Sequence, residues 1–372
     1  MRGRLARAPA WLPDGQGEGG HLKPLGLRRV LAAVVCCWAL SPTACQSPRE
    51  SSAVRELGGL IERLSEPGGY FDTDNLISNE TAYVQVMERL KPMGGVYLGV
   101  GPAQNFNYIS RIRPTWAFII DVRRQNMLQH LLYLAIFEKA ATPYQYLCWL
   151  FSRPIREGAE HTGRPGTEAL LSAFESAAPR REIFERDLHS LLQTIGRDLG
   201  VELTPEDEEV IRSIHAAFFH EQLGIRFRSH GRPRMAYHPS YRTLLTARSA
   251  KGRESHFLAS PEGYGYVRKL ARRGHLVPVV GDFAGPHALR AVGDFVRSLG
   301  EEVSVFYVSN VEFYLLRSGT FDAFVENIRS LPTREDSLLI RAYFNYGRAH
   351  PAGLPGHRST LLLQYVPRFL AL

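Results

Sequence analysis

Short apolar runs along the chain predict the strands of one sheet. Five of them occupy residues 96–100, 116–121, 276–282, 303–310 and 338–346. Nearly every position in these runs is apolar, whereas a strand with one solvent-facing side alternates apolar and polar residues. Runs of this kind are typical of a parallel sheet that is covered on both faces.

Helical patterns fall between the predicted strands. Residues 285–300 and 320–332 separate the last three runs, and each segment is close to the length of one crossover helix. Strands that alternate with such helices indicate βαβ units and a doubly wound sheet. We therefore expect an α/β fold with a Rossmann-like, mostly parallel sheet.

The second and third strands are separated by a much longer segment. Residues 125–275 lie between them, and helix-periodic stretches dominate there at 126–140, 181–196 and 205–224. Such a segment is too long to be a loop in a compact domain. We expect a helical insertion, either with its own core or as a cap on the sheet. It would divide a Rossmann-like domain into parts at 67–124 and 276–372.

The first 45 residues have the features of an export signal. Arg28 and Arg29 precede an apolar run at 30–40, and a segment of small residues leads to Cys45. The run is shorter than the roughly 20 residues of a membrane-spanning helix. We predict a signal peptide over 1–45 with lipidation at Cys45, a linker with a first helix over 46–66, and an exported, membrane-tethered protein. A cytoplasmic protein with a chance apolar patch in its tail is the alternative.

Composition and charge restrict the partners only slightly. The chain is 44% hydrophobic and 22% charged, as in ordinary globular proteins. Half of the formal charge of +8 lies before Cys45, so little positive excess remains and nucleic acid is not an expected partner. Cys148 stands alone in an apolar run, and no cysteine or histidine spacing predicts a metal site.

A basic segment lies within the predicted insertion. Residues 225–253 contain Arg226, Arg228, Arg232, Arg234, Arg242, Arg248 and Lys251, with Phe227, Tyr237 and Tyr241 among them. Basic residues mixed with aromatic ones can grip a phosphate backbone or an anionic lipid surface. A solvated basic face of the insertion is the plainer interpretation.

The first strand is followed by a glycine turn that suits a ligand. Gly99 and Gly101 stand where the strand passes into a helix, so backbone N–H groups can approach a guest molecule there. Asp121 ends the second strand 20 residues after Gly101, where an acid can accept hydrogen bonds from ribose hydroxyls. Asn105, four residues after Gly101, and Arg123, two residues after Asp121, are further candidates for binding the ligand. A tight turn that needs glycine for packing alone is the alternative.

Polar residues also follow the third and fourth strands. Asp282 and Phe283 come after the third strand, where Asp282 can accept from an adenine amino group and Phe283 can lie against the ring. Ser309, Asn310 and Glu312 follow the fourth strand. Of these, Asn310 and Glu312 are the candidates for catalysis or substrate orientation. Helix capping is the alternative for both groups.

A polar stretch precedes the first strand. Asp74, Asn75, Asn79 and Glu80 belong to the segment "GGYFDTDNLISNETAY". Such a density of short polar side chains usually forms a turn and a helix cap. The segment can equally fold over the edge of the sheet and line the ligand pocket.

Four segments resemble a family of uncharacterised bacterial proteins whose Rossmann-like core is similar to class I S-adenosylmethionine-dependent methyltransferases. They are "GGYFDTDNLISNE", "YLGVGPAQNFNYISRIRPTWAFIIDVRRQN", "VPVVGDFAGPHALRAVGDF" and "VSVFYVSNVEFYL". The resemblance implies a fold and a pocket without a particular reaction. In the methyltransferase pattern, Gly99 and Gly101 would meet the methionine part of the cofactor, Asp121 the ribose, and Asp282 with Phe283 the adenine. Tyr97 replaces the acid of that pattern.

The sequence thus predicts a protein that binds a small ligand of adenosine type. S-adenosylmethionine is the candidate cofactor, and methyl transfer to an unidentified acceptor is the enzymatic version, with Asn310 or Glu312 orienting or deprotonating the acceptor. An exported protein would lie outside the compartment where S-adenosylmethionine is supplied. The alternative is therefore a non-enzymatic cell-envelope protein that keeps the fold and contacts anionic polymers or lipids.

Overall fold

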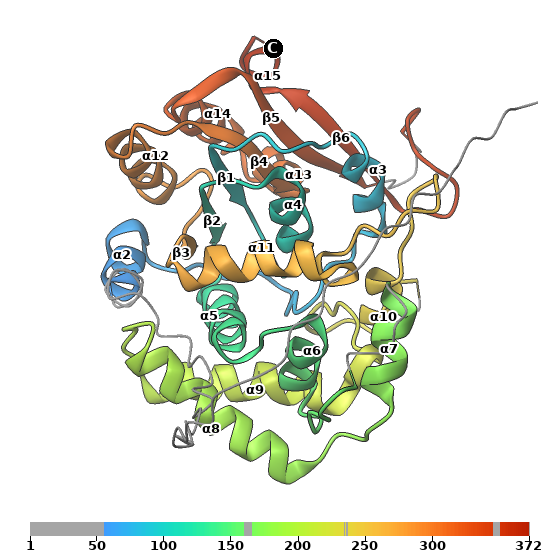
Figure 1. Cartoon of the computed structure of the whole chain (residues 1–372). Helices are drawn as coiled ribbons and strands as arrows, with labels where there is room; N and C mark the ends of the chain where they lie inside the picture. The colour runs from blue at the N-terminus through green and yellow to red at the C-terminus, as the bar shows by residue number, and fades with distance from the viewer. Residues whose placement is uncertain (1–55, 160–165, 234, 236, 345–349, 372) are drawn as a thin grey trace, which may run out of the picture. The chain divides into compact units, whose positions relative to one another are not determined.

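The strands form a single six-stranded sheet in the order β3-β2-β1-β4-β5-β6 (Figure 1). They are β1 (Val96–Gly99), β2 (Trp116–Asp121), β3 (Leu276–Val280), β4 (Val303–Ser309), β5 (Thr333–Phe344) and β6 (Ser359–Tyr365). The first five are parallel, and β6 pairs antiparallel with β5. The computed structural model that shows this sheet describes residues 56–159, 166–233, 235, 237–344 and 350–371. The predicted signal peptide and Cys45 lie outside these ranges.

The coarse prediction of the fold is confirmed. The protein is α/β with a mostly parallel mixed sheet, and its strand order is compatible with a Rossmann-like fold. All residues of β1 and β3 are buried, as expected for strands covered on both faces. The sequence did not predict β6, which adds an antiparallel edge strand to the parallel sheet.

Helices cover the two faces of the sheet in the way that the chain order dictates. Helices α4 (Gln104–Ile112), α5 (Arg124–Lys139) and α11 (Pro261–Arg272) pack together on one face, and α12 (Ala288–Ser298) packs with α14 (Phe321–Arg329) on the other (Figure 1). From β1 the chain adds β2 and β3 toward one edge of the sheet and then β4 and β5 toward the other, so the strand order switches between β1 and β4. In open α/β sheets, ligands bind outside the carboxyl ends of the strands at such a switch point.

The segment between β2 and β3 is helical, as predicted. It contains α6 (Pro143–Phe151), α7 (Thr167–Glu175), α8 (Arg181–Arg197), α9 (Pro205–Glu221) and α10 (Tyr241–Leu245) in addition to α5 and α11. Helix α5 packs against β2 and β3 on one side and against α8 and α9 on the other. Because α5 is covered on all sides, its residues 126–137 are all buried, and this part of the helix has no face exposed to solvent. The insertion therefore shares its core with the sheet, and the described residues from 56 to 371 belong to one compact unit.

Shorter elements complete the chain. They are α2 (Leu57–Leu64), η1 (Thr81–Tyr83), α3 (Val84–Met87), η2 (Gln222–Gly224), η3 (Phe257–Ala259), α13 (Val311–Ser318) and α15 (Val366–Leu370). Helix α2 falls in the segment that the sequence suggested as a linker with a first helix. It buries Leu57, Leu60, Ile61 and Leu64 and packs against β3 and α12, so it belongs to the folded unit.

Candidate functional site

A segment that precedes β1 crosses the carboxyl ends of four strands. We call residues 66–80 the strap. The amide of Glu66 donates to the carbonyl of Val280 at the end of β3, and the amide of Gly69 donates to the carbonyl of Val122 just after β2. Farther along, the carboxyl of Glu80 lies at the end of β4. The polar stretch thus folds over the edge of the sheet, as one of its two interpretations predicted.

The glycine turn after β1 is filled by side chains of the protein itself. The hydroxyl of Tyr97 donates to Asn105 Oδ1 over 2.8 Å. Asn105 Nδ2 donates to the carbonyls of Val100 and Pro102 over 2.9 and 2.8 Å. A Cβ added to Gly99 would lie 2.0 Å from Asn105 Oδ1. Glycine is therefore required at position 99 by internal packing, which was the alternative interpretation of this turn.

Gly101 is different because its backbone conformation demands glycine. Its φ is +79°, a value that residues with a Cβ rarely adopt. Its carbonyl accepts a hydrogen bond from His130 Nε2 over 2.8 Å, and Asn75 of the strap lies against it. The turn is therefore in contact with both the strap and α5.

Asp121 at the end of β2 is engaged by an arginine two residues later. Arg123 donates from Nε to Oδ1 over 3.0 Å and from Nη2 to Oδ2 over 2.8 Å. Both side chains are 6% exposed. Arg123 Nη1 also donates to the carbonyls of Thr73 and Asp74, so one guanidinium joins β2 to the strap. The carboxylate of Asp121 thus orients the guanidinium of Arg123, and this guanidinium holds the strap in place.

The turn after β3 is held by Glu66 at the start of the strap. Glu66 Oε1 accepts from the amide of Asp282 over 2.7 Å, and Oε2 accepts from the amides of His287 and Ala288 over 3.1 Å. A carboxylate at the start of a helix is favoured by the amides and the helix dipole. The exposed Asp282 caps the turn through the amide of Ala284. A cavity of about 420 Å³ lies here, lined by Ser65, Glu66, Pro67, Asp282, Gly285, Pro286 and His287.

Phe283 does not face that cavity. It is 3% exposed and packs against Phe306 and Phe324, with ring centroids 4.9 and 5.8 Å away. The sequence placed Phe283 against an adenine ring. The structure places it in the core between β4 and α14, because the turn after β3 directs it inward.

The two residues predicted to be catalytic lie at the start of α13. Asn310 is half-buried at the N-cap position, and its Oδ1 lies 3.3 Å from Ser309 Oγ, whose proton is directed to Glu80. Glu312 forms a bidentate pair with Arg341 of β5, at 2.7 and 2.5 Å. Glu312 is therefore committed to an ion pair between α13 and the sheet.

Glu80 is a buried carboxyl at this rim, and its hydrogen-bond partners among the described residues are three neutral side chains. It is 1% exposed, and it accepts hydrogen bonds from Ser309 Oγ at 2.5 Å, Tyr307 OH at 2.9 Å and Gln104 Nε2 at 3.3 Å. Burial raises the pKa of the Glu80 carboxyl above its ordinary value, although the three hydrogen bonds act in the opposite direction. The carboxyl lies at the switch point of the sheet.

The remaining strap candidates are placed less centrally. Asp74 Oδ1 accepts from the amide of Arg228, and burial raises the pKa of its carboxyl. Asn75 has a positive φ of 46°, which is uncommon for a residue other than glycine. Asn79 is half-buried next to Glu80. The structure thus brings Asp74, Asn75 and Glu80 to the same edge as Gly101 and Asp121.

Several buried polar atoms around the strap have no hydrogen-bond partner among the described residues. They are Thr73 Oγ1, Gln104 Oε1, both amide atoms of Asn126, and His130 Nδ1. Asn126 and His130 are four residues apart on α5 and so share a face. Burial lowers the pKa of His130 to about 4, so the ring is neutral. Its Nε2 donates to Gly101, which leaves Nδ1 as an acceptor.

Sequence reasoning missed Gln104, Asn126 and His130. The signal was a set of polar residues on positions that the helical pattern of α4 and α5 assigns to the interior. A cavity of about 20 Å³ beside the strap is lined partly by Gln104, Ser78, Tyr241 and His256. This volume holds about one water molecule.

The basic segment of the insertion is largely neutralised by acids of the chain itself. The ion pairs are Arg228–Glu221, Arg232–Asp72, Arg242–Glu175, Arg248–Glu254 and Lys251–Glu88. Arg226 donates to the carbonyl of His238, and Arg234 lies outside the described residues. The segment therefore presents much less unbalanced positive charge than its sequence suggests.

The fold and the strap define an α/β protein with a mostly parallel mixed sheet and a covered carboxyl rim. The chain belongs to the family described as Domain of unknown function (DUF7790), whose model matches residues 75–180 and 206–369. No curated protein matches the chain. Across the described ranges, no helix is long and apolar enough to cross a bilayer. Within the same ranges, no group of three or more His, Cys, Asp or Glu residues is arranged to hold a metal ion.

Proposed function

We propose that the protein binds a small ligand of adenosine type beneath the strap, beside the turn that follows β1. Methyl transfer from S-adenosylmethionine is the enzymatic version of this proposal, with Asn310 orienting the acceptor. The observation that carries it is the set of buried, unpartnered polar atoms on Thr73, Gln104, Asn126 and His130. Buried polar groups in native proteins almost always have partners, so each of these atoms needs either a ligand group or a bound water as its partner.

The chemistry of these atoms supports a ligand that donates hydrogen bonds. Gln104 Oε1, Asn126 Oδ1 and His130 Nδ1 are all acceptors, whereas Asn126 Nδ2 is a donor. Ribose hydroxyls and an adenine amino group supply donors, and a phosphate at neutral pH supplies chiefly acceptors. Two cations at this rim are already paired, Arg123 with Asp121 and Arg341 with Glu312. A nucleoside is therefore favoured over a nucleotide.

Two features bear on how such a ligand would lie. The hollow next to Asp282 has a volume of about 420 Å³ and lies at the end of β3, where adenine was expected, but it is open to solvent along the exposed Pro67, Asp282 and His287. Tyr97 and Asn105 occupy the space around Gly99 that the methionine part would need. The support is thus stronger for the nucleoside than for the methionine part. Binding beneath the strap requires the strap to move, because the cavity beside it holds only about one water.

The test is a thermal-shift and calorimetric titration with adenosine, S-adenosylmethionine, S-adenosylhomocysteine and ATP. We expect adenosine to raise the unfolding temperature and ATP to have a smaller effect. Asn126→Leu removes an unpartnered amide at similar volume, so it should abolish the ligand effect without loss of stability. Thr194→Val is the matched control, since Thr194 Oγ1 is also buried without a partner but lies on α8.

The two variants separate the outcomes. Ligand binding that survives in Asn126→Leu would contradict the location of the site. Absence of any shift with all four compounds in the wild type would contradict the proposed ligand class. A shift with S-adenosylmethionine alone would favour the methyltransferase version.

A second candidate is a non-enzymatic cell-envelope protein. The observation that favours it is the strap itself, which occupies the rim and uses Asp121 and Glu66 for internal contacts. Binding to an anionic polymer or to anionic vesicles that weakens steeply with salt would support this candidate. The pairing of the basic segment makes such binding weak. Mass spectrometry of protein from its own host tests the proposed tether, because an acylated Cys45 is expected only after export.

A further inference from the structure

Ser309 has a strained backbone at a strand-to-helix turn. It ends β4, and α13 begins two residues later. Its φ is +48°, which is uncommon for a residue with a Cβ. Such conformations are strained and cluster at functional sites. The nucleophilic serines of α/β-hydrolases stand on the same kind of strained strand-to-helix turn.

The hydroxyl of Ser309 is in contact with a base. Ser309 Oγ donates to Glu80 Oε1 over 2.5 Å, and no cation pairs with that carboxyl in the described part of the chain. Tyr307 and Gln104 hold the other carboxyl oxygen, so the base is fixed in orientation. Ser309 is half-buried, whereas Glu80 is shielded from solvent. A hydroxyl within hydrogen-bond reach of an oriented base is the arrangement of an activated nucleophile.

We propose that Ser309 and Glu80 form a nucleophile–base pair that makes the β4–α13 turn a site of acyl transfer. Ser309 Oγ attacks the carbonyl carbon of an ester while its proton passes to Glu80. The bond to the alcohol then breaks, and Glu80 returns the proton to the departing oxygen. Water hydrolyses the acyl-serine in the same way, giving acid and alcohol and restoring both residues.

The start of α13 supplies the remaining part of such a site. The amides of Val311 and Glu312 open the helix and have no acceptor within it, so they can stabilise the oxyanion that forms on the carbonyl. Both residues are half-buried beside Ser309.

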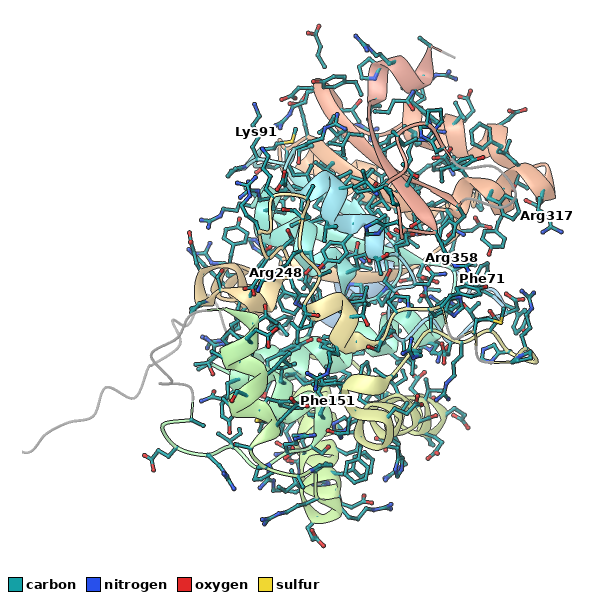
Figure 2. All side chains as sticks on the ribbon, turned by 90° about the vertical axis from the view of Figure 1, so that its right-hand side faces the viewer. Phe71, Lys91, Phe151, Arg248, Arg317 and Arg358 are labelled. Atoms are coloured by element: carbon teal, nitrogen blue, oxygen red, sulfur yellow. The ribbon has the colours of Figure 1, made fainter. Side chains whose placement is uncertain are left out.

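The neighbouring surface indicates the class of substrate. Phe313 of α13 is 42% exposed, and Phe71 of the strap packs edge-on against Tyr314 of α13 with ring centroids 4.8 Å apart. Phe71 and Arg317, labelled in Figure 2, lie on the same side of the molecule, and Arg317 covers the ring of Phe313. An aromatic surface beside the serine suits an ester with an apolar acyl chain. This site does not depend on the proposed nucleoside site.

The experiment is covalent labelling of the full chain with a fluorophosphonate probe that carries an apolar alkyl chain. Mass spectrometry then locates the modified residue. We expect the label on Ser309 in the folded protein and none after heat denaturation. Glu80→Gln should slow labelling by roughly 10²–10⁴-fold, the usual contribution of a general base.

Two variants keep the result interpretable. Ser309→Gly removes the hydroxyl but adopts the positive φ without strain, so it should fold and resist the probe. Ser318→Ala is the control, because Ser318 lies on the same helix and its hydroxyl donates only to the carbonyl of Leu315 and pairs with Thr320. Labelling at another residue, equal labelling of Glu80→Gln, or no labelling of the folded wild type would overturn the proposal.

Discussion

The carboxylates at the two ends of the strap have different hydrogen-bond partners. In the first half, Glu66 is held by three backbone amides, and Arg123 joins Asp121 to the strap carbonyls. In the second half, Glu80 is buried, whereas Glu66 is half-buried, and Glu80 accepts hydrogen bonds only from a serine, a tyrosine and a glutamine. We call the first half the compensated end, because an arginine pairs with the buried carboxylate of Asp121 there. We call the second half the uncompensated end, because no cation pairs with Glu80 in the described part of the chain.

This difference separates structural from chemical roles. A buried carboxylate paired with an arginine fixes the chain, because removal of either partner leaves an uncompensated buried charge. A buried carboxyl surrounded by neutral donors can exchange a proton, because neither protonation state is locked by a neighbouring charge. The compensated end accounts for how the strap is attached, and the uncompensated end is where proton transfer is to be sought.

The largest expected effect on stability comes from removing the arginine that pairs with Asp121. Arg123→Met leaves the carboxylate of Asp121 buried and unpaired, which should lower the free energy of unfolding by about 3–5 kcal/mol. Arg232→Met is the matched control, because Arg232 also holds the strap, through Asp72, but is 67% exposed. We expect it to cost less than about 1 kcal/mol. Urea denaturation measures both, and equal losses would remove the distinction between the inner and outer attachments.

The filled turn after β1 gives the next effect. A methyl group on Gly99 would overlap Asn105 and Tyr97, so Gly99→Ala should destabilise by about 1–3 kcal/mol. Gly196→Ala has open space around the added Cβ in α8 and should stabilise by about 0.5–1 kcal/mol. Thermal melts of the two variants provide the comparison. A harmless Gly99→Ala would indicate room for a ligand in the turn.

The uncompensated end should be visible as a pH dependence of stability. Because the folded pKa of Glu80 is raised, the folded state binds its proton more tightly than the unfolded state does. Stability should therefore fall as pH rises from the ordinary pKa of a carboxyl to the folded pKa, by at most about 1.4 kcal/mol per pH unit. Denaturation of wild type and Glu80→Gln across this window should differ in slope.

The other titratable groups that face Glu80 do not change their charge in this pH window. They are the phenols of Tyr97, Tyr108 and Tyr307, from β1, α4 and β4, and burial raises the pKa of each. They stay neutral over the window in which the carboxyl titrates. Identical slopes for wild type and Glu80→Gln would show that Glu80 does not change its charge there.

The smallest effect belongs to the middle of the strap. Thr73 Oγ1 is buried without a partner, so Thr73→Val should leave stability unchanged or raise it by up to about 1 kcal/mol. Thr194→Val should behave alike on α8. Only Thr73→Val should weaken adenosine binding. A clear loss of stability in Thr73→Val alone would mean that its hydroxyl has a partner in solution.

The sequence predicted much of the fold because buried parallel strands have an unmistakable pattern. The five strands, the crossover helices α12 and α14, and the helical nature of residues 125–275 follow from apolar periodicity. Strand β6 was missed because Ser359, Thr360 and Gln364 weaken its pattern, and its existence depends on pairing with β5. Phe283 was misplaced because a strand end does not reveal which way the next side chain turns.

By itself, the sequence determined which residues reach the carboxyl edge of the sheet. Strand ends lie at one edge in any parallel sheet, so Gly101, Asp121 and Ser309 meet there by topology alone. Tertiary structure decided what each of them does there. A hydrogen bond depends on a few ångströms of approach between segments far apart in the chain, and the strap, over 200 residues before Ser309, brings Glu80 to its hydroxyl. The pattern of apolar residues carries no information about such contacts.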